Sequence, residues 1–140
     1  MVNYLLDTNI ISELTKIKPS EDVMNWLSNQ SEISLFLSSI TIAEIMRGVS
    51  RLEDGKKRNK LMQWVQEEIP NKFYGRILDF DMKCAFLWGK WQGQADKKGR
   101  PFSVMDGQIA TVASRFGLTL VTRNTKDMID LPVKVFNPFE

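Results

Sequence analysis

The stretch Tyr4–Asn9, "YLLDTN", is a short apolar run that ends on an aspartate, with a hydroxyl and an amide directly after it. The residues from Val2 to Leu6 predict a β-strand that places Asp7 at its carboxyl end. Aspartate is common in loops that follow strands, so Asp7 gains a functional meaning only if other carboxylates lie close to it. The rest of the sequence indicates where such carboxylates are.

Strands and helices alternate along the rest of the chain. Apolar, β-branched and aromatic runs predict four further strands, at Ile33–Ser39, Arg76–Phe80, Leu118–Thr122 and Val133–Phe136. Apolar residues at helical spacing predict helices at Ile10–Thr15, Glu21–Ser28 with Ser20 as N-cap, Thr41–Leu52, around Leu61–Val65, Met82–Asp96, Met105–Phe116 with Gly117 at its end, and Thr125–Ile129. This order predicts an α/β fold with a mostly parallel central sheet covered by helices on both faces.

The composition excludes several classes of enzyme. The sequence has no histidine and one cysteine, Cys84. It therefore lacks Ser-His-Asp and Cys-His nucleophiles, histidine or multi-cysteine zinc sites, and intramolecular disulfides. Catalysis would have to rest on carboxylates, lysines, hydroxyls or a bound ion, and Cys84 is expected to be a buried apolar residue.

The bulk properties predict a single folded domain over residues 1–140, since a chain of this length with 43% hydrophobic residues can bury a core without disulfides. The apolar runs are too short for a membrane span, and Asp7 and Glu13 lie where a signal peptide would be basic and apolar. We therefore expect a cytoplasmic protein with no membrane contact. The net charge of +2 limits any nucleic-acid contact to a local patch.

Three carboxylates are expected at the carboxyl edge of the sheet, where open α/β folds bind ligands. Asp7 ends the first strand, Glu44 begins the helix after the second, and Asp127 follows "LTLVT". Asp106 follows a loop, in the first turn of the helix that leads into that same strand, so its place at this edge is less fixed.

Helix capping is the structural alternative for three of these acids. A hydroxyl or amide precedes each by three residues, in the pairs Thr41 and Glu44, Ser103 and Asp106, and Asn124 and Asp127. Acids in a first helical turn also interact favourably with the helix dipole. No capping role is expected for Asp7, which makes it the acid that best separates the two interpretations.

A cluster of carboxylates without histidine suits Mg²⁺ or Mn²⁺, which prefer oxygen ligands. Such an ion lowers the pKa of a water and neutralises charge on a phosphodiester that is being cleaved. Without a cation the carboxylates would repel one another and some would take up protons. Thr8 and Thr122 are candidates to orient water or a carboxylate, and Asn9 and Asn124 to contact substrate or fix the acids.

The segments "LLDTNIISEL", "SSITIAEIMRG" and "SVMDGQIATVASRFGLTLVTRNTKDM", in this order, give the chain its resemblance to a known family. The sequence resembles the PIN-domain ribonucleases, and most closely the VapC/FitB-type toxins of bacterial toxin–antitoxin pairs. The resemblance implies a three-layer α/β/α fold and a Mg²⁺- or Mn²⁺-dependent endoribonuclease. It also implies that the metal-binding catalytic quartet is Asp7, Glu44, Asp106 and Asp127.

The resemblance further matches Thr122 to the family's small polar helper, with Asn9 and Asn124 as flanking candidates. Met128 departs from the pattern, because relatives often have an aromatic residue after the last acid; we expect this to be a packing position. The resemblance implies a homodimer that is silenced by a small cognate antitoxin, whose tail occupies the groove and often inserts an arginine among the acids. Operator DNA would be bound only through the antitoxin.

Basic side chains are expected to bring RNA phosphates to the acidic site, which repels them by itself. Arg47 and Arg51 share the helix face of Glu44, and Arg123 precedes the last acid. A basic loop of Lys97, Lys98 and Arg100 lies shortly before Asp106. The alternative is that these are solvated charges or partners of the acids, and Lys56–Lys60 is expected to be a solvated helix start.

The helix with Met82, Phe86, Trp88 and Trp91 is apolar over more than one face, which predicts either core packing or a contact with a second copy or the antitoxin. Two other functions stay open. The chain could be a non-catalytic nucleic-acid or partner-binding scaffold whose acids cap helices. A metal-dependent phosphatase or receiver-like domain is disfavoured, since no Asp-x-Asp pair follows the first strand.

Overall fold

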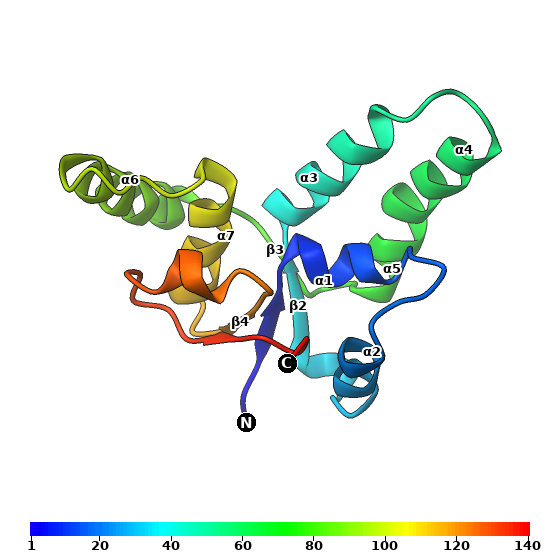
Figure 1. Cartoon of the computed structure of the whole chain (residues 1–140), viewed down its shortest axis with the longest axis horizontal. Helices are drawn as coiled ribbons and strands as arrows, with labels where there is room; N and C mark the ends of the chain where they lie inside the picture. The colour runs from blue at the N-terminus through cyan, green and yellow to red at the C-terminus, as the bar shows by residue number, and fades with distance from the viewer.

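The computed structural model describes all 140 residues. Five parallel strands form one sheet in the order β3-β2-β1-β4-β5, so the first strand lies at the centre (Figure 1). The strands are β1 (Tyr4–Leu6), β2 (Leu35–Ser38), β3 (Ile77–Leu78), β4 (Thr119–Val121) and β5 (Val135–Phe136). A parallel sheet with β1 in the middle confirms the predicted α/β class.

Seven α-helices cover the two faces of this sheet. They are α1 (Thr8–Glu13), α2 (Glu21–Ser28), α3 (Ser39–Ser50), α4 (Lys56–Gln63), α5 (Ile69–Lys72), α6 (Met82–Lys97) and α7 (Val104–Arg115). A π-helical stretch, η2 (Trp64–Glu68), joins α4 to α5, and the 3-10 turns are η1 (Glu32–Ser34) and η3 (Thr125–Met128). Figure 1 shows α6 and α7 on one side of the strands and α1 to α5 on the other, which is the three-layer arrangement. None of the helices has the length and apolar character that a membrane crossing requires.

Adjacent residues of the central strands are buried on opposite faces. Leu5 belongs to the core cluster beneath α6 and α7, while Leu6 belongs to the cluster beneath α1, α2 and α3. Leu120 and Val121 on β4 divide in the same way. Because side chains alternate along a strand and both faces are covered, the strands are continuous apolar runs and not alternating ones.

The structure corrects the bounds of several predicted elements. The strands pair over shorter ranges than their apolar runs: β1 begins at Tyr4 and not at Val2, and β5 begins at Val135 and not at Val133. The first helix begins at Thr8 instead of Ile10, and the helix after β2 begins at Ser39 instead of Thr41. Gly117 has a φ of 68°, the left-handed backbone expected after a helix end, which confirms its predicted role.

Candidate functional site

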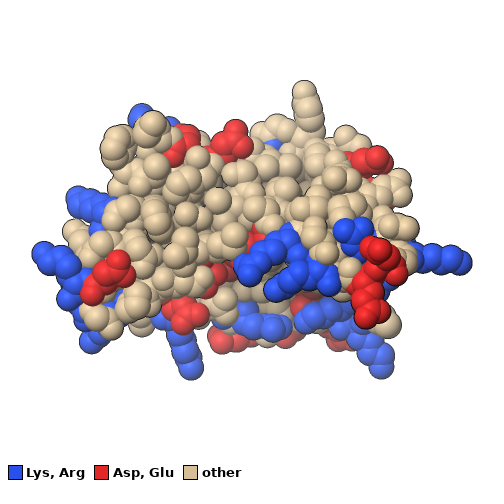
Figure 2. Space-filling view, turned by 90° about the horizontal axis from the view of Figure 1, so that it is seen from above, with Lys and Arg blue, Asp and Glu red and all other residues tan.

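Three of the four predicted acids line one polar cavity at the carboxyl edge of the sheet. The cavity has a volume of about 320 Å³, and its lining contains no hydrophobic residue: Asp7, Thr8, Asn9, Ser12, Glu13, Lys16, Glu44, Asp106, Arg123 and Asn124. Asp127, the fourth acid, lines an adjoining cavity of about 550 Å³ together with Asp106. Figure 2 looks onto this end of the molecule and shows carboxylates near its middle with Lys and Arg side chains beside them.

Asp7 is fixed in place by its neighbours. Its side chain is 2% exposed, and Oδ1 accepts a hydrogen bond from the backbone N–H of Thr8 at 2.8 Å. Oδ2 accepts from the hydroxyl of Thr122 at 2.7 Å and from the amide of Asn9 at 3.4 Å. Asp7 is thus the N-cap of α1, which corrects the expectation that it has no capping role. This cap explains why α1 starts two residues early.

Thr122 is the centre of the hydrogen bonds around Asp7. The residue is fully buried directly after β4, and its Oγ1 donates to Asp7 while accepting from the backbone N–H of Asn124 at 3.0 Å and from Asn9 Nδ2 at 3.3 Å. Asn9 also accepts a bond from the backbone N–H of Arg123 at 3.2 Å. These contacts tie the segment after β1 to the segment after β4, so the structure brings Asn9, Thr122 and Asn124 together with Asp7.

Glu44 faces the cavity from α3. Its Oε1 accepts a hydrogen bond from Thr8 Oγ1 at 2.7 Å. The N-cap of α3 is Ser38, whose hydroxyl accepts from the backbone N–H of Thr41, so Glu44 lies beyond the first turn. The capping pair of Thr41 and Glu44 is therefore not formed, and this alternative for Glu44 is wrong.

The remaining capping pairs are also not formed. Ser103 and Asn124 precede their helical segments without a side-chain cap bond, although Asp106 and Asp127 do lie in the first turns. Neither carboxylate accepts a hydrogen bond from another residue. Asp106 is half-buried, and burial, followed by the charges of Asp7, Glu44 and Asp127, raises its pKa to about 6. Burial raises the pKa of Asp7 as well, with Glu44 adding to the effect and the bonds from Thr122 and Thr8 opposing it.

The donor types of the cavity suit a divalent cation, but its carboxylates are spread apart. No group of three or more acidic side chains is arranged so that it could hold a metal ion as it stands. Besides burial, the negative charges of Asp7, Glu44 and Asp127 nevertheless raise the pKa of Asp106, and a bound cation would relieve this repulsion. Oxygen donors without histidine match the preference of Mg²⁺ or Mn²⁺.

The predicted basic residues lie in different places. Lys98 and Arg100 line the cavity that contains Asp106 and Asp127. Arg51 lines a larger cavity of about 1100 Å³ that opens beside Thr8 and Glu44. Arg47 is exposed on α3 and does not line any of these three cavities.

Glu13 was not predicted from the sequence to be a member of this site. It is the last residue of α1, and its side chain is 3% exposed although it carries a charge. The signal that could have found it is an acid directly among the apolar residues of "NIISEL", followed by Lys16 at helical spacing. Met128 is 1% exposed within the core, as expected for a packing position.

The aromatic and apolar residues of α6 are divided between the core and the surface. Trp91 is buried in the core, whereas Met82 and Phe86 are 70% and 73% exposed. Cys84 is buried, and burial raises the pKa of its thiol to about 11, as expected for an unreactive apolar side chain.

Comparisons with known proteins identify the family. Residues 4–133 match the model of the PIN domain. The chain is 39% identical to Toxin FitB of Neisseria gonorrhoeae over 96% of this chain and 97% of that protein. It is 33% identical to VapC ribonuclease Y4jK of Sinorhizobium fredii over 97% of each. Among solved structures, FitAB bound to the IR36 DNA fragment matches with a TM-score of 0.90 and 38% identity, covering 98% of this chain and 96% of that one. The chain belongs to the PIN-domain family, in the group of the FitB and VapC toxins.

Proposed function

We propose that this protein is an endoribonuclease toxin that hydrolyses RNA phosphodiester bonds with the help of Mg²⁺ or Mn²⁺ bound by Asp7, Glu44, Asp106 and Asp127. The observation that carries the proposal is the convergence of Asp7, Glu44 and Asp106 on one polar cavity, where burial and the neighbouring charges raise the pKa of Asp106. Acids that repel one another do not stabilise a fold, so their convergence supports the proposed cation site. The relatives named as a toxin and as a ribonuclease support the same function.

Each polar neighbour has a distinct role in this proposal. Thr122 and Asn9 orient the Asp7 carboxylate, and Thr8 orients that of Glu44. Asn124 positions the Thr122 hydroxyl through its backbone N–H and leaves its own side chain at the cavity for substrate. When bound, the cation supplies an activated water and neutralises charge on the phosphate. The exposed Arg47 is retained as a candidate for more distant RNA contact.

We propose a cognate antitoxin and a second copy of the chain as partners. The large cavity between α1, α3 and α4 combines apolar residues with a basic rim and opens beside Glu44, which suits an antitoxin tail. The exposed Met82 and Phe86 on α6 offer an apolar surface for a homodimer. DNA in the FitAB structure supports the view that operator DNA is bound through the antitoxin. The protein would act in the cytoplasm.

The scaffold alternative is weakened by the same geometry. It requires the acids to be helix caps, and the side chains of Glu44, Asp106 and Asp127 cap no helix. Only Asp7 does so, and asparagine is as good an N-cap as aspartate. Replacing Asp7 by asparagine therefore removes a ligand charge while keeping the cap.

The test is cleavage of a broad pool of labelled RNA by antitoxin-free protein in Mn²⁺ or Mg²⁺ and in EDTA. We expect cleavage that depends on the cation and that falls by at least about 100-fold in Asp7→Asn, because a charged ligand is lost. Asp79→Asn is the matched control, since Asp79 also follows a parallel strand, β3, but lines none of the three cavities around the acids. Cleavage that survives in folded Asp7→Asn would contradict the proposal.

A further inference from the structure

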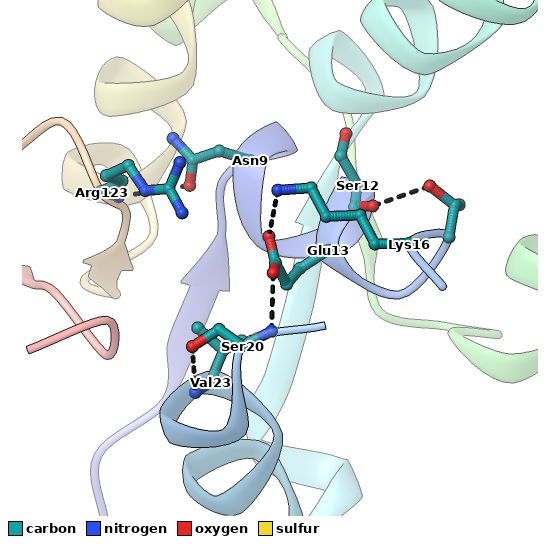
Figure 3. A network of polar contacts seen from close by, with 8 residues as sticks. Asn9, Ser12, Glu13, Lys16, Ser20, Val23 and Arg123 are labelled. Carbon is teal, nitrogen blue, oxygen red and sulfur yellow. Dashed lines mark hydrogen bonds and ion pairs between the residues drawn. The ribbon is translucent and has the colours of Figure 1, made fainter. Parts of the chain in front are cut away.

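A second charged cluster lies in the cavity of the acids and is left unused by the mechanism above. Glu13 is nearly fully buried at the end of α1, six residues after Asp7 on the same helix. Its Oε2 forms an ion pair with Lys16 Nζ at 2.9 Å, and its Oε1 accepts from the backbone N–H of Ser20 at 2.7 Å (Figure 3). The bond from Lys16 and then that from Ser20 lower the pKa of Glu13, so this carboxylate is charged where Asp106 is prone to protonation.

The ammonium group of Lys16 is paired with Glu13 but keeps N–H donors free. The Lys16 side chain is 51% exposed, and of its three N–H donors only the one toward Glu13 has a protein partner. The same cavity is lined by Asp7, Glu44 and Asp106, so the ammonium lies at the rim of the proposed catalytic site. Besides accepting from Ser20, the buried Glu13 therefore fixes a half-exposed cation at that rim.

Arg123 lines the cavity as well and is also fixed without an acidic partner. Its backbone N–H donates to Asn9, and its guanidinium lies 3.8 Å from the centre of the Phe139 ring. No carboxylate lies within ion-pair distance of it, so its side-chain donors stay free. In Figure 3 the Lys16 and Arg123 head groups point toward each other across the space beside Glu13.

We propose that Lys16 and Arg123 bind the RNA phosphate next to the scissile one, and that Glu13 is the positioning residue that holds Lys16 at the cavity rim. This inference rests on the proposed function and names the residues that bring substrate to it. A strand of phosphates approaching an acidic cavity is repelled unless cations flank the entry. Arginine stacked on an aromatic ring loses little freedom when it binds phosphate, and lysine anchored by a carboxylate likewise needs little reordering.

The experiment is binding of a fluorescein-labelled single-stranded RNA to the full chain, measured by anisotropy in EDTA over a series of KCl concentrations, so that no cleavage is needed. We expect Lys16→Met and Arg123→Met each to weaken binding about fivefold and to reduce the slope of log affinity against log salt by about 0.7 per lost contact. Lys134→Met, at the opposite edge of the sheet, is the matched control and should match the wild type.

Glu13→Gln separates positioning from simple electrostatics. It removes a negative charge, so a purely electrostatic effect would tighten RNA binding. We expect the opposite, binding weaker by about threefold, and the double variant with Lys16→Met should bind no more weakly than Lys16→Met alone, because the two residues act as one unit. Glutamine keeps an acceptor for Ser20, and thermal unfolding checks that the variant folds. Tighter binding by Glu13→Gln, or wild-type slopes in both Lys16→Met and Arg123→Met, would overturn the inference.

Cleavage assays then distinguish this inference from the proposed function. In Mn²⁺ the rim variants, Lys16→Met and Arg123→Met, should have a higher KM for RNA and a nearly unchanged kcat, since the replaced residues bind a phosphate that does not react. If the variants change RNA binding as expected but the wild type does not cleave, the proposed function fails, and what stands is that Lys16 and Arg123 bind RNA phosphate with Glu13 as the positioning residue. If the wild type cleaves and the rim variants keep its KM, the inference alone fails.

Discussion

Asp7 and Asp106 line one cavity but are held in opposite ways. The Asp7 carboxylate receives hydrogen bonds from Thr8, Thr122 and Asn9, whereas that of Asp106 receives none. Burial raises the pKa of both, but only Asp7 has donors that oppose the rise. The Asp7 carboxylate is therefore held by donors of the fold, whereas no hydrogen-bond donor stabilises the charge of Asp106, which a bound cation would balance. This difference predicts that substitutions around Asp7 and at Asp106 have distinct effects.

A large loss of activity is expected from removing the hydroxyl of Thr122. Thr122→Val keeps the shape of the side chain but removes the hydroxyl that contacts Asp7, Asn9 and Asn124. We expect RNA cleavage to fall by about 10- to 100-fold and the free energy of unfolding by about 1 to 3 kcal/mol, since buried polar partners are left unpaired. Single-turnover cleavage and urea unfolding measure both. Thr122→Ser is the control that should restore most of each, and wild-type values in the valine variant would contradict the role of the hydroxyl.

A smaller effect, of opposite sign on the free energy of unfolding, is expected from replacing Asp106. The folded protein binds a proton at Asp106 more tightly than the unfolded chain, with a pKa of about 6 against 3.8, so stability from this group is lost as pH rises through that interval. Asp106→Asn removes the loss. In EDTA at pH 7 we expect the variant to be more stable by about 1 kcal/mol, allowing for the solvent around this half-buried group, or about 3 °C in Tm.

The gain should vanish below about pH 3, where the wild-type carboxyl is mostly protonated in both the folded and the unfolded state. Glu13 and Asp81 have lowered pKa values and change stability in the other direction, so only the difference between wild type and variant is informative. A variant that is less stable than the wild type in EDTA at pH 7 would contradict the repulsion among the acids.

The positions of the acids could be predicted from the sequence better than the hydrogen bonds that hold them. The places of Asp7, Glu44 and Asp127 followed from strand ends in a parallel sheet, which hydrophobic periodicity predicts well. The cap made by Asp7 was not predicted. An aspartate side chain can accept hydrogen bonds from the nearby backbone or from a distant hydroxyl such as that of Thr122, and the sequence does not show which residues meet. The local pattern in front of Glu44 suggested a cap that Ser38 provides instead.

The role of Glu13 could not be found from local patterns either. A carboxylate at the end of an apolar helix looks like an ordinary solvated residue, and only the return of the chain at Ser20 buries it. Arg123 shows the same limitation, since its stacking partner Phe139 comes from the end of the chain. Contacts between distant segments decide these positions, and one sequence does not specify them.

The most direct test of the cation site is the thermal unfolding of wild type and Asp106→Asn at pH 7, with EDTA and with Mn²⁺. A ligand that binds only the folded protein raises Tm, and by more when it binds more tightly. We predict that Mn²⁺ raises the Tm of the wild type by several degrees and that of Asp106→Asn by much less, so that the order of the two proteins reverses. An unchanged Tm of the wild type in millimolar Mn²⁺, or equal shifts in both proteins, would contradict a cation site formed by these carboxylates.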